Sequence, residues 1–345
     1  MRTLVKGRNR TVAIEGDRII AEGGGFDIMI ECRDADVHPG LINAHDHLHR
    51  NHYGRLGAGH YLNAYRWAED IQLRFAQRIA QRKRLPRRAA LLAGAWKNLF
   101  AGVTTVSHHD RWEADFDHAF PSRVARVASA DSLGMEEQIR APDAEPFCLH
   151  VAEGIDEAAN EETAILDDKG LLNEHLIAVH GVGIDGCEID RFERSGAALT
   201  WCPSSNHFLF GRSVSAKLLD RNIDLLLGSD SRLTGAGDLL DELRTAARSR
   251  LIDEQRLANA VGSVSASRLG LGAHSLEQGS KADLILLAAP LSNACSNDVA
   301  LTIVDGVIRV ARPDIARQLG KYAKHGQAKR LGRVVRWTTQ QGRLV

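Results

Sequence analysis

The chain has 345 residues, of which 44% are hydrophobic, and its 44 Lys and Arg balance 44 Asp and Glu. A neutral balance gives no general attraction to nucleic acid or to an anionic membrane, so a small-molecule substrate is favoured over a polyanion. The length is enough for one large core, or for a large core with a small satellite domain.

The cysteine pattern favours a reducing compartment. The five cysteines are Cys32, Cys148, Cys187, Cys202 and Cys295. Their scattered positions and odd number fit a cytoplasmic protein better than a disulfide framework. The N-terminus has no apolar run of signal-peptide length, and no stretch approaches the roughly 18 apolar residues of a membrane helix. We therefore expect a cytoplasmic protein without a membrane partner, and a homo-oligomer is neither favoured nor opposed.

The two ends of the chain show the same sequence pattern. Residues 1–40 alternate short apolar runs with turns, as in TVAIEG and FDIMIEC, which predicts small antiparallel strands. After residue 275 the same pattern occurs in KADLILLAA and ALTIVDGVIRVA, where VDG is a hairpin signal. We therefore predict a small β-sandwich domain built from residues 1–40 and 276–345.

Between these ends, residues 41–275 alternate apolar runs of strand length with helical patterns. GLINAH, PFCLHVAE and IDLLLGSD are strand candidates, and RRAALLAGAWKNLFAG and DLLDELRTAARSRL are helix candidates. This alternation predicts an α/β fold, and at this length a (β/α)8 TIM-like barrel leads. Residues 50–88 are long for a loop after the first strand. They are compatible with a lid over the site or with ordinary helix packing, which is favoured.

Polar residues end four of the predicted central strands. They are His45, His47, His150, Glu153, His180 and Asp230. His45 and His47 are two apart, so on a strand they point to the same face. Each signal alone has a simpler explanation, such as a packed histidine or an aspartate that caps a helix. Together they lie at the carboxyl ends of strands, where barrel active sites form.

Three imidazoles and one carboxylate match the ligand preference of zinc or ferrous iron, with a position open for water. The combination therefore predicts a centre for a divalent metal ion, with Zn²⁺ favoured over Fe²⁺.

The segments PGLINAHDHLH, HVAEG, VHG, WCPSSN and GSDS occur in this order along the chain. Together they resemble the cytosine deaminase and chlorohydrolase-like branch of the amidohydrolase superfamily. LGLGAHSLEQGSKADLILL is similar to that branch's return into the small β-domain, so the resemblance covers nearly the whole chain. The metal ligands that it implies are His45, His47, His150 and Asp230. It also implies that Glu153 moves protons and that His180, with Asp230, takes or orients the proton of the bound water.

The resemblance also bears on the number of metal ions. Binuclear relatives bridge two metals with a carbamylated lysine between the H-x-H pair and the third histidine. Here no lysine occurs between Lys97 and Lys169. A single metal ion is therefore expected, and a bridging glutamate is the alternative.

The expected activity is hydrolytic deamination of an amino-substituted heterocycle, such as a purine, a pyrimidine or a related ring. Dechlorination or hydrolysis of a cyclic amide at the same site is the alternative reaction. A non-catalytic metal-binding protein is disfavoured, because it would not need Glu153 as a proton shuttle. The interval between the H-x-H pair and the third histidine is compact, and the R-F-x-P signature expected of a guanine deaminase is absent. The substrate is therefore left undefined.

Three further residues are candidates for substrate contact. His109 ends the predicted strand VTTVSHH, and Asn51 follows the H-x-H pair closely. Arg232 lies two residues after Asp230. It could bind an anionic group of the substrate, although a surface salt bridge is slightly favoured.

Overall fold

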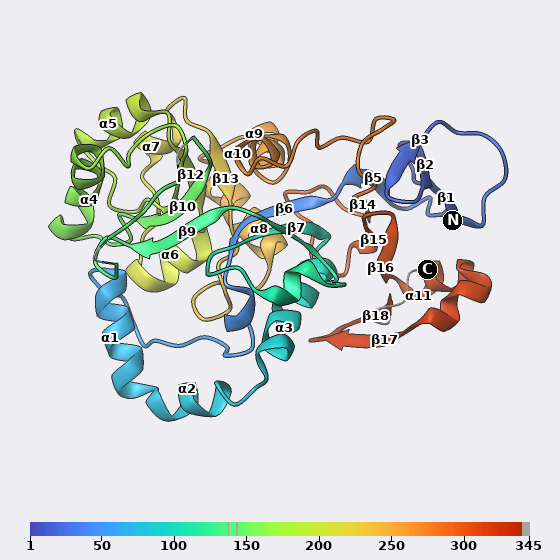
Figure 1. Cartoon of the computed structure of the whole chain (residues 1–345), viewed down its shortest axis with the longest axis horizontal. Coiled ribbons are helices and arrows are strands. Elements are labelled where there is room, and N and C mark those ends of the chain that lie inside the picture. The colour runs from blue at the N-terminus through green and yellow to red at the C-terminus, as the bar shows by residue number, and fades with distance from the viewer. Residues whose placement is uncertain (137, 143, 340–345) are drawn as a thin grey trace.

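Parallel strands form the centre of the fold, and two mainly antiparallel sheets lie at one end of the molecule (Figure 1). The computed structural model describes residues 1–136, 138–142 and 144–339. One central sheet has the order β6-β7-β8 and the other has the order β13-β12-β11-β10-β9, and all neighbouring strands in both are parallel. The bounds are β6 Leu41–Asp46, β7 Val103–His108, β8 Arg123–Ala125, β9 Ala128–Ser132, β10 Phe147–Val151, β11 Leu176–His180, β12 Ala198–Trp201 and β13 Leu225–Leu227. The predicted α/β architecture is confirmed.

Most of the central strands are buried along their whole length, whereas β8 and β9 are partly exposed. Every residue of β6, β7, β10 and β11 is buried. Strands covered on both faces read as continuous apolar runs, which explains why FCLHV and LIAVH show no alternation. The imidazoles among them lie at or near the carboxyl ends of their strands.

The two central sheets lie close to each other at two places. The Asp230 N–H, just after β13, donates to the carbonyl of His45 in β6 at 3.0 Å. At the other side, only Arg126 and Val127 separate β8 from β9. The chain therefore passes from one parallel sheet into the other without a crossover helix.

Helices alternate with strands over only part of the central region. Helices follow β6, β10, β11, β12 and β13, but between β7 and β8 the chain forms only the short 3₁₀ helix η2, Ala114–Asp117. In the described residues between β9 and β10 there is no helix. The regular eight-unit alternation expected from the sequence is thus interrupted here. The segment between Asp110 and Phe147 is short, and Pro121, Pro142 and Pro146 oppose a continuous helix within it.

The helices that flank the central strands have the following bounds. They are η1 Leu48–Arg50, α1 Ala64–Arg74, α2 Ala76–Arg82, α3 Arg87–Phe100, α4 Glu157–Asp168, α5 Glu188–Ser195, α6 Pro203–Phe210, α7 Ala216–Leu219, α8 Leu239–Ser249, α9 Glu254–Ala260 and α10 Ser263–Arg268. Residues 50–88, which are long for a loop, contain α1 and α2. The helix α1 begins after Asn63, whose side chain accepts a hydrogen bond from the Arg66 N–H. None of the described helices is long and apolar enough to cross a bilayer.

Strands from both chain ends meet in one sheet. Its order is β17-β18-β16-β15-β14-β5, so β5 from the N-terminal segment pairs antiparallel with β14 from the C-terminal segment. A second sheet has the order β3-β2-β1-β4. The bounds are β1 Arg2–Lys6, β2 Thr11–Glu15, β3 Arg18–Ile20, β4 Ile28–Glu31, β5 Asp36–Pro39, β14 Leu284–Leu287, β15 Val299–Val304, β16 Val307–Ala311, α11 Pro313–Gln318, η3 Gly320–His325, β17 Gly326–Leu331 and β18 Val334–Thr339.

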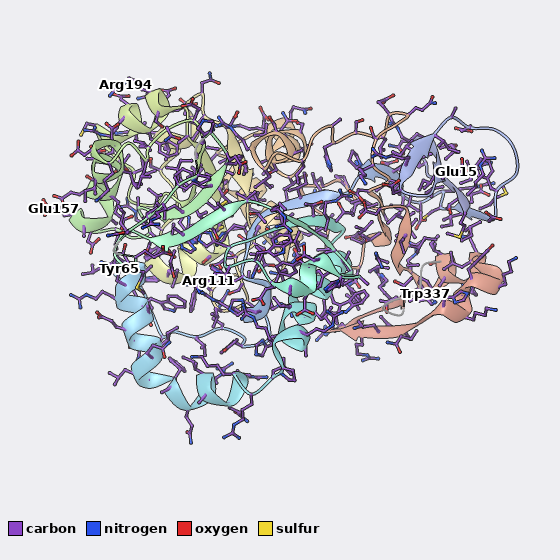
Figure 2. The ribbon with its side chains drawn as sticks, viewed as in Figure 1. Glu15, Tyr65, Arg111, Glu157, Arg194 and Trp337 are labelled. Carbon is purple, nitrogen blue, oxygen red and sulfur yellow. The ribbon has the colours of Figure 1, made fainter. Side chains whose placement is uncertain are left out.

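The sheets at the chain ends share a core of their own. Val5 and Ile30 pack in one apolar cluster with Leu286, Ile303 and Trp337. Figure 2 shows Trp337 in this part of the molecule, at the opposite end from Glu157 of α4. The central strands have a separate and larger core cluster.

Candidate metal centre and active site

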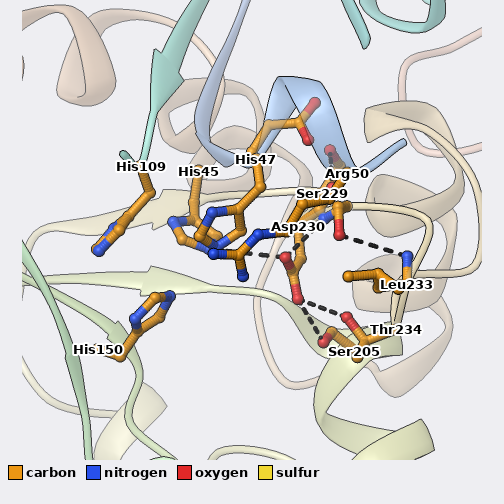
Figure 3. Close-up of polar contacts among 12 residues, drawn as sticks. His45, His47, Arg50, His109, His150, Ser205, Ser229, Asp230, Leu233 and Thr234 are labelled. Atoms are coloured by element: carbon orange, nitrogen blue, oxygen red, sulfur yellow. Dashed lines mark hydrogen bonds and ion pairs between the residues drawn. The ribbon is translucent and has the colours of Figure 1, made fainter. Parts of the chain in front are cut away.

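Five imidazoles gather at the carboxyl ends of the central strands, and the ring centre of His109 lies 5.0 Å from that of His45. The ring centre of His45 lies 5.0 Å from that of His47, 5.1 Å from that of His150 and 5.6 Å from that of His180. Figure 3 shows His45, His47 and His150 facing a common space beside Asp230. The structure therefore brings together imidazoles that lie 135 residues apart in the chain.

Asp230 brings a carboxylate to this group. Its Oδ1 lies 3.8 Å from Nε2 of His45. Its Oδ2 accepts from Ser205 Oγ at 2.8 Å and from Thr234 Oγ1 at 2.6 Å. Burial opposes the charge of this carboxylate, but His180 and the hydrogen bonds from Thr234, Ser231 and Ser205 outweigh it and lower the pKa of Asp230. The side chain is thus held as an anion in a buried position.

Glu153 lies across from His180. Its Oε1 is 3.4 Å from Nε2 of His180, and its side chain is 15% exposed. Burial raises the pKa of Glu153, and His180 and His150 only partly oppose this rise. A carboxyl group whose pKa is raised toward neutrality can both hold and release a proton, as a general acid or base must.

Each of three imidazoles has one ring nitrogen engaged away from the common space. The Nδ1 of His47 lies 3.0 Å from Asp110 Oδ2, and that of His180 lies 2.8 Å from Asn206 Oδ1. The Nδ1 of His150 lies 2.7 Å from the carbonyl oxygen of Asp131. Such contacts fix the ring orientation and leave Nε2 available, which is the arrangement of metal-binding histidines.

The donor set fits a divalent metal ion. Both ring nitrogens of His45 are buried and have no hydrogen-bond partner among the described residues, which is costly unless another partner is bound there. Ligand atoms of His45, His47 and His150 lie within 4.8 Å of one another, as do those of His45, His180 and Asp230. Burial lowers the pKa of His45 and of His47 well below the usual value, so both rings are neutral, the form that binds metal.

Backbone strain is concentrated at this site. His180 has φ 77°, Asp230 has φ 50° and Ala152, next to Glu153, has φ 51°. A positive φ costs a residue other than glycine about 1–3 kcal/mol, and residues with this strained conformation cluster at functional sites. The surrounding hydrogen bonds therefore hold these side chains in positions that the local sequence does not favour.

A cavity of about 340 Å³ adjoins the candidate metal ligands. His47, His150, Glu153, His180 and Asp230 line its polar end. The apolar wall opposite is formed by Tyr53, Leu56, Trp67, Ile71, Ile79 and Leu233. Two of its residues, Trp67 and Ile71, belong to α1. An apolar wall with a few convergent polar groups is the usual character of a site for a small molecule.

A second group of possible ligands is less suited to a metal ion. His49, His108 and Asp110 also have ligand atoms within 4.8 Å of one another. However, His108 Nδ1 accepts from the Leu48 N–H at 3.2 Å, so in the neutral ring the proton is on Nε2. Arg50 Nη2 lies 3.9 Å from Asp110 Oδ2, and this positive charge opposes a second cation.

The three candidates for substrate contact lie in different places. His109 stacks on His150 at 4.1 Å between ring centres and lines a neighbouring polar cavity of about 480 Å³. The Asn51 side chain is buried and donates to Asp46 Oδ1, while its oxygen accepts from the Arg232 N–H. Neither Asn51 nor Arg232 lines the cavity that adjoins the candidate metal ligands. Their contact with substrate stays a prediction.

Sequence reasoning did not assign roles to the first turn of α6. Ser204, Ser205 and Asn206 are consecutive, and they contact Glu242, Asp230 and His180, respectively. The signal that could have pointed to them is WCPSSN, in which a run of small polar residues directly follows a buried strand.

Comparison with known proteins finds a family model and relatives that match part of the chain. The amidohydrolase family model matches residues 143–309. A 5-methylthioadenosine/S-adenosylhomocysteine deaminase from Pyrococcus abyssi is 30% identical over 194 residues, which are 46% of this chain and 45% of that relative. The chain thus matches a little under half the length of this relative.

Solved structures extend the likeness to almost the whole chain. An adenosine deaminase from Xanthomonas campestris with bound zinc has a TM-score of 0.67 and 18% identity, and the match covers 93% of this chain and 97% of that one. An atrazine chlorohydrolase from Arthrobacter aurescens TC1 complexed with zinc has a TM-score of 0.70 and 18% identity, with 93% and 99% covered. At this level of identity the likeness shows a shared fold.

Proposed function

We propose that this chain, which carries an amidohydrolase-family domain, is a metal-dependent hydrolase that deaminates an amino-substituted heterocycle. One divalent ion would be held by His45, His47, His150 and Asp230. Zn²⁺ is the preferred ion, because imidazole and carboxylate ligands suit it, and Fe²⁺ is the alternative.

The observation that carries this proposal is the unpartnered, buried imidazole of His45 beside Asp230, whose pKa is lowered, and Glu153, whose pKa burial raises. A cation bound at this imidazole would give one of its two unpartnered nitrogens a partner. A carboxyl group whose pKa is raised by burial in the same cavity is suited to proton transfer.

When bound, the metal lowers the pKa of a coordinated water toward neutrality. Glu153 would protonate a ring nitrogen of the substrate as the oxygen of water adds to the adjacent carbon. It would then take the proton that the water gives up and pass it to the amino group, so that the C–N bond breaks and ammonia leaves. His180 presents Nε2 toward Glu153 at 3.4 Å, and Asn206 holds the opposite nitrogen of the ring at 2.8 Å. His180 can therefore orient a proton at a defined point beside Glu153.

The cavity supports a planar, partly apolar substrate. The amino-bearing edge of the ring would face Glu153 and His180, and the remainder would pack on the wall that contains Trp67 and Leu233. Burying the apolar part of a ring against this wall excludes water from the reacting edge.

We also propose that the two parallel sheets form the wall of a single TIM-like barrel, residues 41–275, with residues 1–40 and 276–345 as a separate β-sandwich domain. The hydrogen bond from Asp230 to the His45 carbonyl and the direct passage from β8 to β9 support one continuous wall. The five cysteines are all free, which is consistent with a cytoplasmic location.

A release assay tests the proposed reaction. Purified protein loaded with Zn²⁺ or Fe²⁺ is incubated with aminopurines, aminopyrimidines, amino- and chlorotriazines and cyclic amides, and ammonia, chloride and ring opening are measured. Ammonia release from amino-heterocycles is expected. Chloride release or ring opening alone would move the assignment to another leaving group, and the absence of both bound metal and turnover would contradict the proposal.

A further inference from the structure

A buried lysine lies beneath the proposed metal centre. Lys97 belongs to α3, and its side chain is 0% exposed. Its Nζ is 2.9 Å from Asp46 Oδ2, and it donates to Ser229 Oγ at 2.9 Å and to the Asp230 carbonyl at 3.0 Å. An ammonium group has three N–H bonds, so each of them has one acceptor here.

These acceptors lie next to the proposed metal ligands. Asp46 stands between His45 and His47 in the chain, and Ser229 directly precedes Asp230. Lys97 therefore joins the end of β6, where His45 lies and which His47 directly follows, to the loop after β13, which carries Asp230.

Asparagine side chains complete the connection between these two segments. Asn43 Nδ2 donates to Asn98 Oδ1 at 2.8 Å and to Ser229 Oγ at 2.7 Å, and Asn43 Oδ1 accepts from the Ser229 N–H at 3.0 Å. Asn98 Nδ2 in turn donates to Asp46 Oδ2 at 2.7 Å. A buried network in which the polar groups have partners is rigid and favours one arrangement of its members.

We propose that Lys97 is a positioning residue that sets the metal affinity of the site by holding His45 and His47 at a fixed distance from Asp230. Asp230 adopts a left-handed backbone conformation, with φ 50°. The hydrogen bond from Lys97 to its carbonyl opposes relaxation of that strained backbone. The inference rests on the metal site of the proposed function.

Charge balance for Asp46 is the competing explanation. Lys97→Met would leave the Asp46 carboxylate buried without its cation, which destabilises the fold whatever Lys97 does for the metal. The double variant Asp46→Asn/Lys97→Met removes both charges. It also removes the hydrogen bonds from Lys97 to the Ser229 hydroxyl and to the Asp230 carbonyl. A loss of metal affinity in this variant therefore reports the positioning role of Lys97 and not an unbalanced charge on Asp46.

The test uses the full-length protein stripped of metal and titrated with Co²⁺. Metal affinity is measured by competition with a chromophoric chelator, geometry by the visible spectrum of bound Co²⁺, and folding by the Tm of the apo protein. Both variants should bind Co²⁺ about 10–100-fold more weakly, as is usual when a group that orients metal ligands is removed, and with an altered spectrum. The double variant should recover Tm relative to Lys97→Met, but not affinity.

The control is Lys281→Met. Lys281 lies outside the central strands, and its ammonium group donates a hydrogen bond of 2.5 Å to Asp17 Oδ2. It should leave Co²⁺ affinity and spectrum unchanged. Wild-type affinity in Lys97→Met, or recovery of affinity and spectrum together with Tm in the double variant, would overturn the positioning role. Failure of the wild-type protein to bind Co²⁺ is a distinct result that would overturn the metal site and this inference with it.

Discussion

Asn206 and His180 are paired across the turn that begins α6, with Asn206 Oδ1 2.8 Å from His180 Nδ1. With the Nδ1 proton directed at this oxygen, the lone pair of Nε2 points toward Glu153. Asn206 thus determines which ring nitrogen of His180 is presented to the cavity, although the two residues are 26 positions apart in sequence.

Asn206→Ala should reduce kcat by about tenfold or more and leave the metal content unchanged, because His180 would lose the contact that fixes its tautomer and orientation. Steady-state kinetics with metal analysis measures this. Asn160→Ala is the matched control, since Asn160 donates to the Gly183 carbonyl in the segment after β11 without contacting His180. Equal losses in both variants would argue against the orienting role.

Glu153→Gln should retain the metal and lose about 10²–10⁴-fold in kcat, the usual contribution of a positioned acid or base. The amide keeps the shape of the side chain but cannot carry the proton. Turnover and metal stoichiometry are measured together. Glu161→Gln, at an exposed position of α4, serves as the control and should behave as wild type. A near-native rate in Glu153→Gln would remove Glu153 from the mechanism.

Removal of the metal should abolish turnover and lower the Tm, because a ligand that binds only the folded state stabilises it by about 2.7 kcal/mol at 100 times its Kd. Dialysis against a chelator, followed by titration with Zn²⁺ or Fe²⁺, tests this and identifies the ion that restores more activity. His45→Gln should bind no metal at stoichiometric concentrations. His118→Gln, at an exposed histidine, is the control. Full activity in metal-free protein would contradict the proposed centre.

Glu242 should make the apo protein less stable as pH rises. Burial raises the pKa of Glu242 to about 8, although the Ser204 hydroxyl and N–H donate to its carboxyl group and oppose this rise. Above its unfolded value of 4.5, the folded state therefore holds a proton that the unfolded state has lost. Its stabilising contribution is complete below that pH and is lost progressively up to about 8.

Glu242→Gln should flatten this decline, because the amide does not titrate. Tm measured by differential scanning calorimetry at several pH values over this range gives the slope for both proteins. Glu254→Gln, which removes an exposed glutamate of α9, is the control and should keep the wild-type slope. Parallel curves for wild type and Glu242→Gln would show that folding does not raise the pKa of Glu242.

Much of the central fold could be predicted from local sequence. FCLHV, LIAVH and ALTW are strands because continuous runs of this length fit buried parallel strands. The interval from Asp110 to Phe147 could not be predicted in the same way. Its strands β8 and β9 are short and partly exposed, and their position depends on pairing with β7 and β10.

The sequence by itself determined which chemical groups end the central strands, because strand periodicity and the order of the polar residues are local properties. Only the tertiary structure decided which nitrogen of each imidazole is free, and that Lys97 joins Asp46 to the Asp230 loop. Those contacts join residues separated by 26 to 133 positions. They follow from how helices and strands pack against one another, which no local pattern encodes.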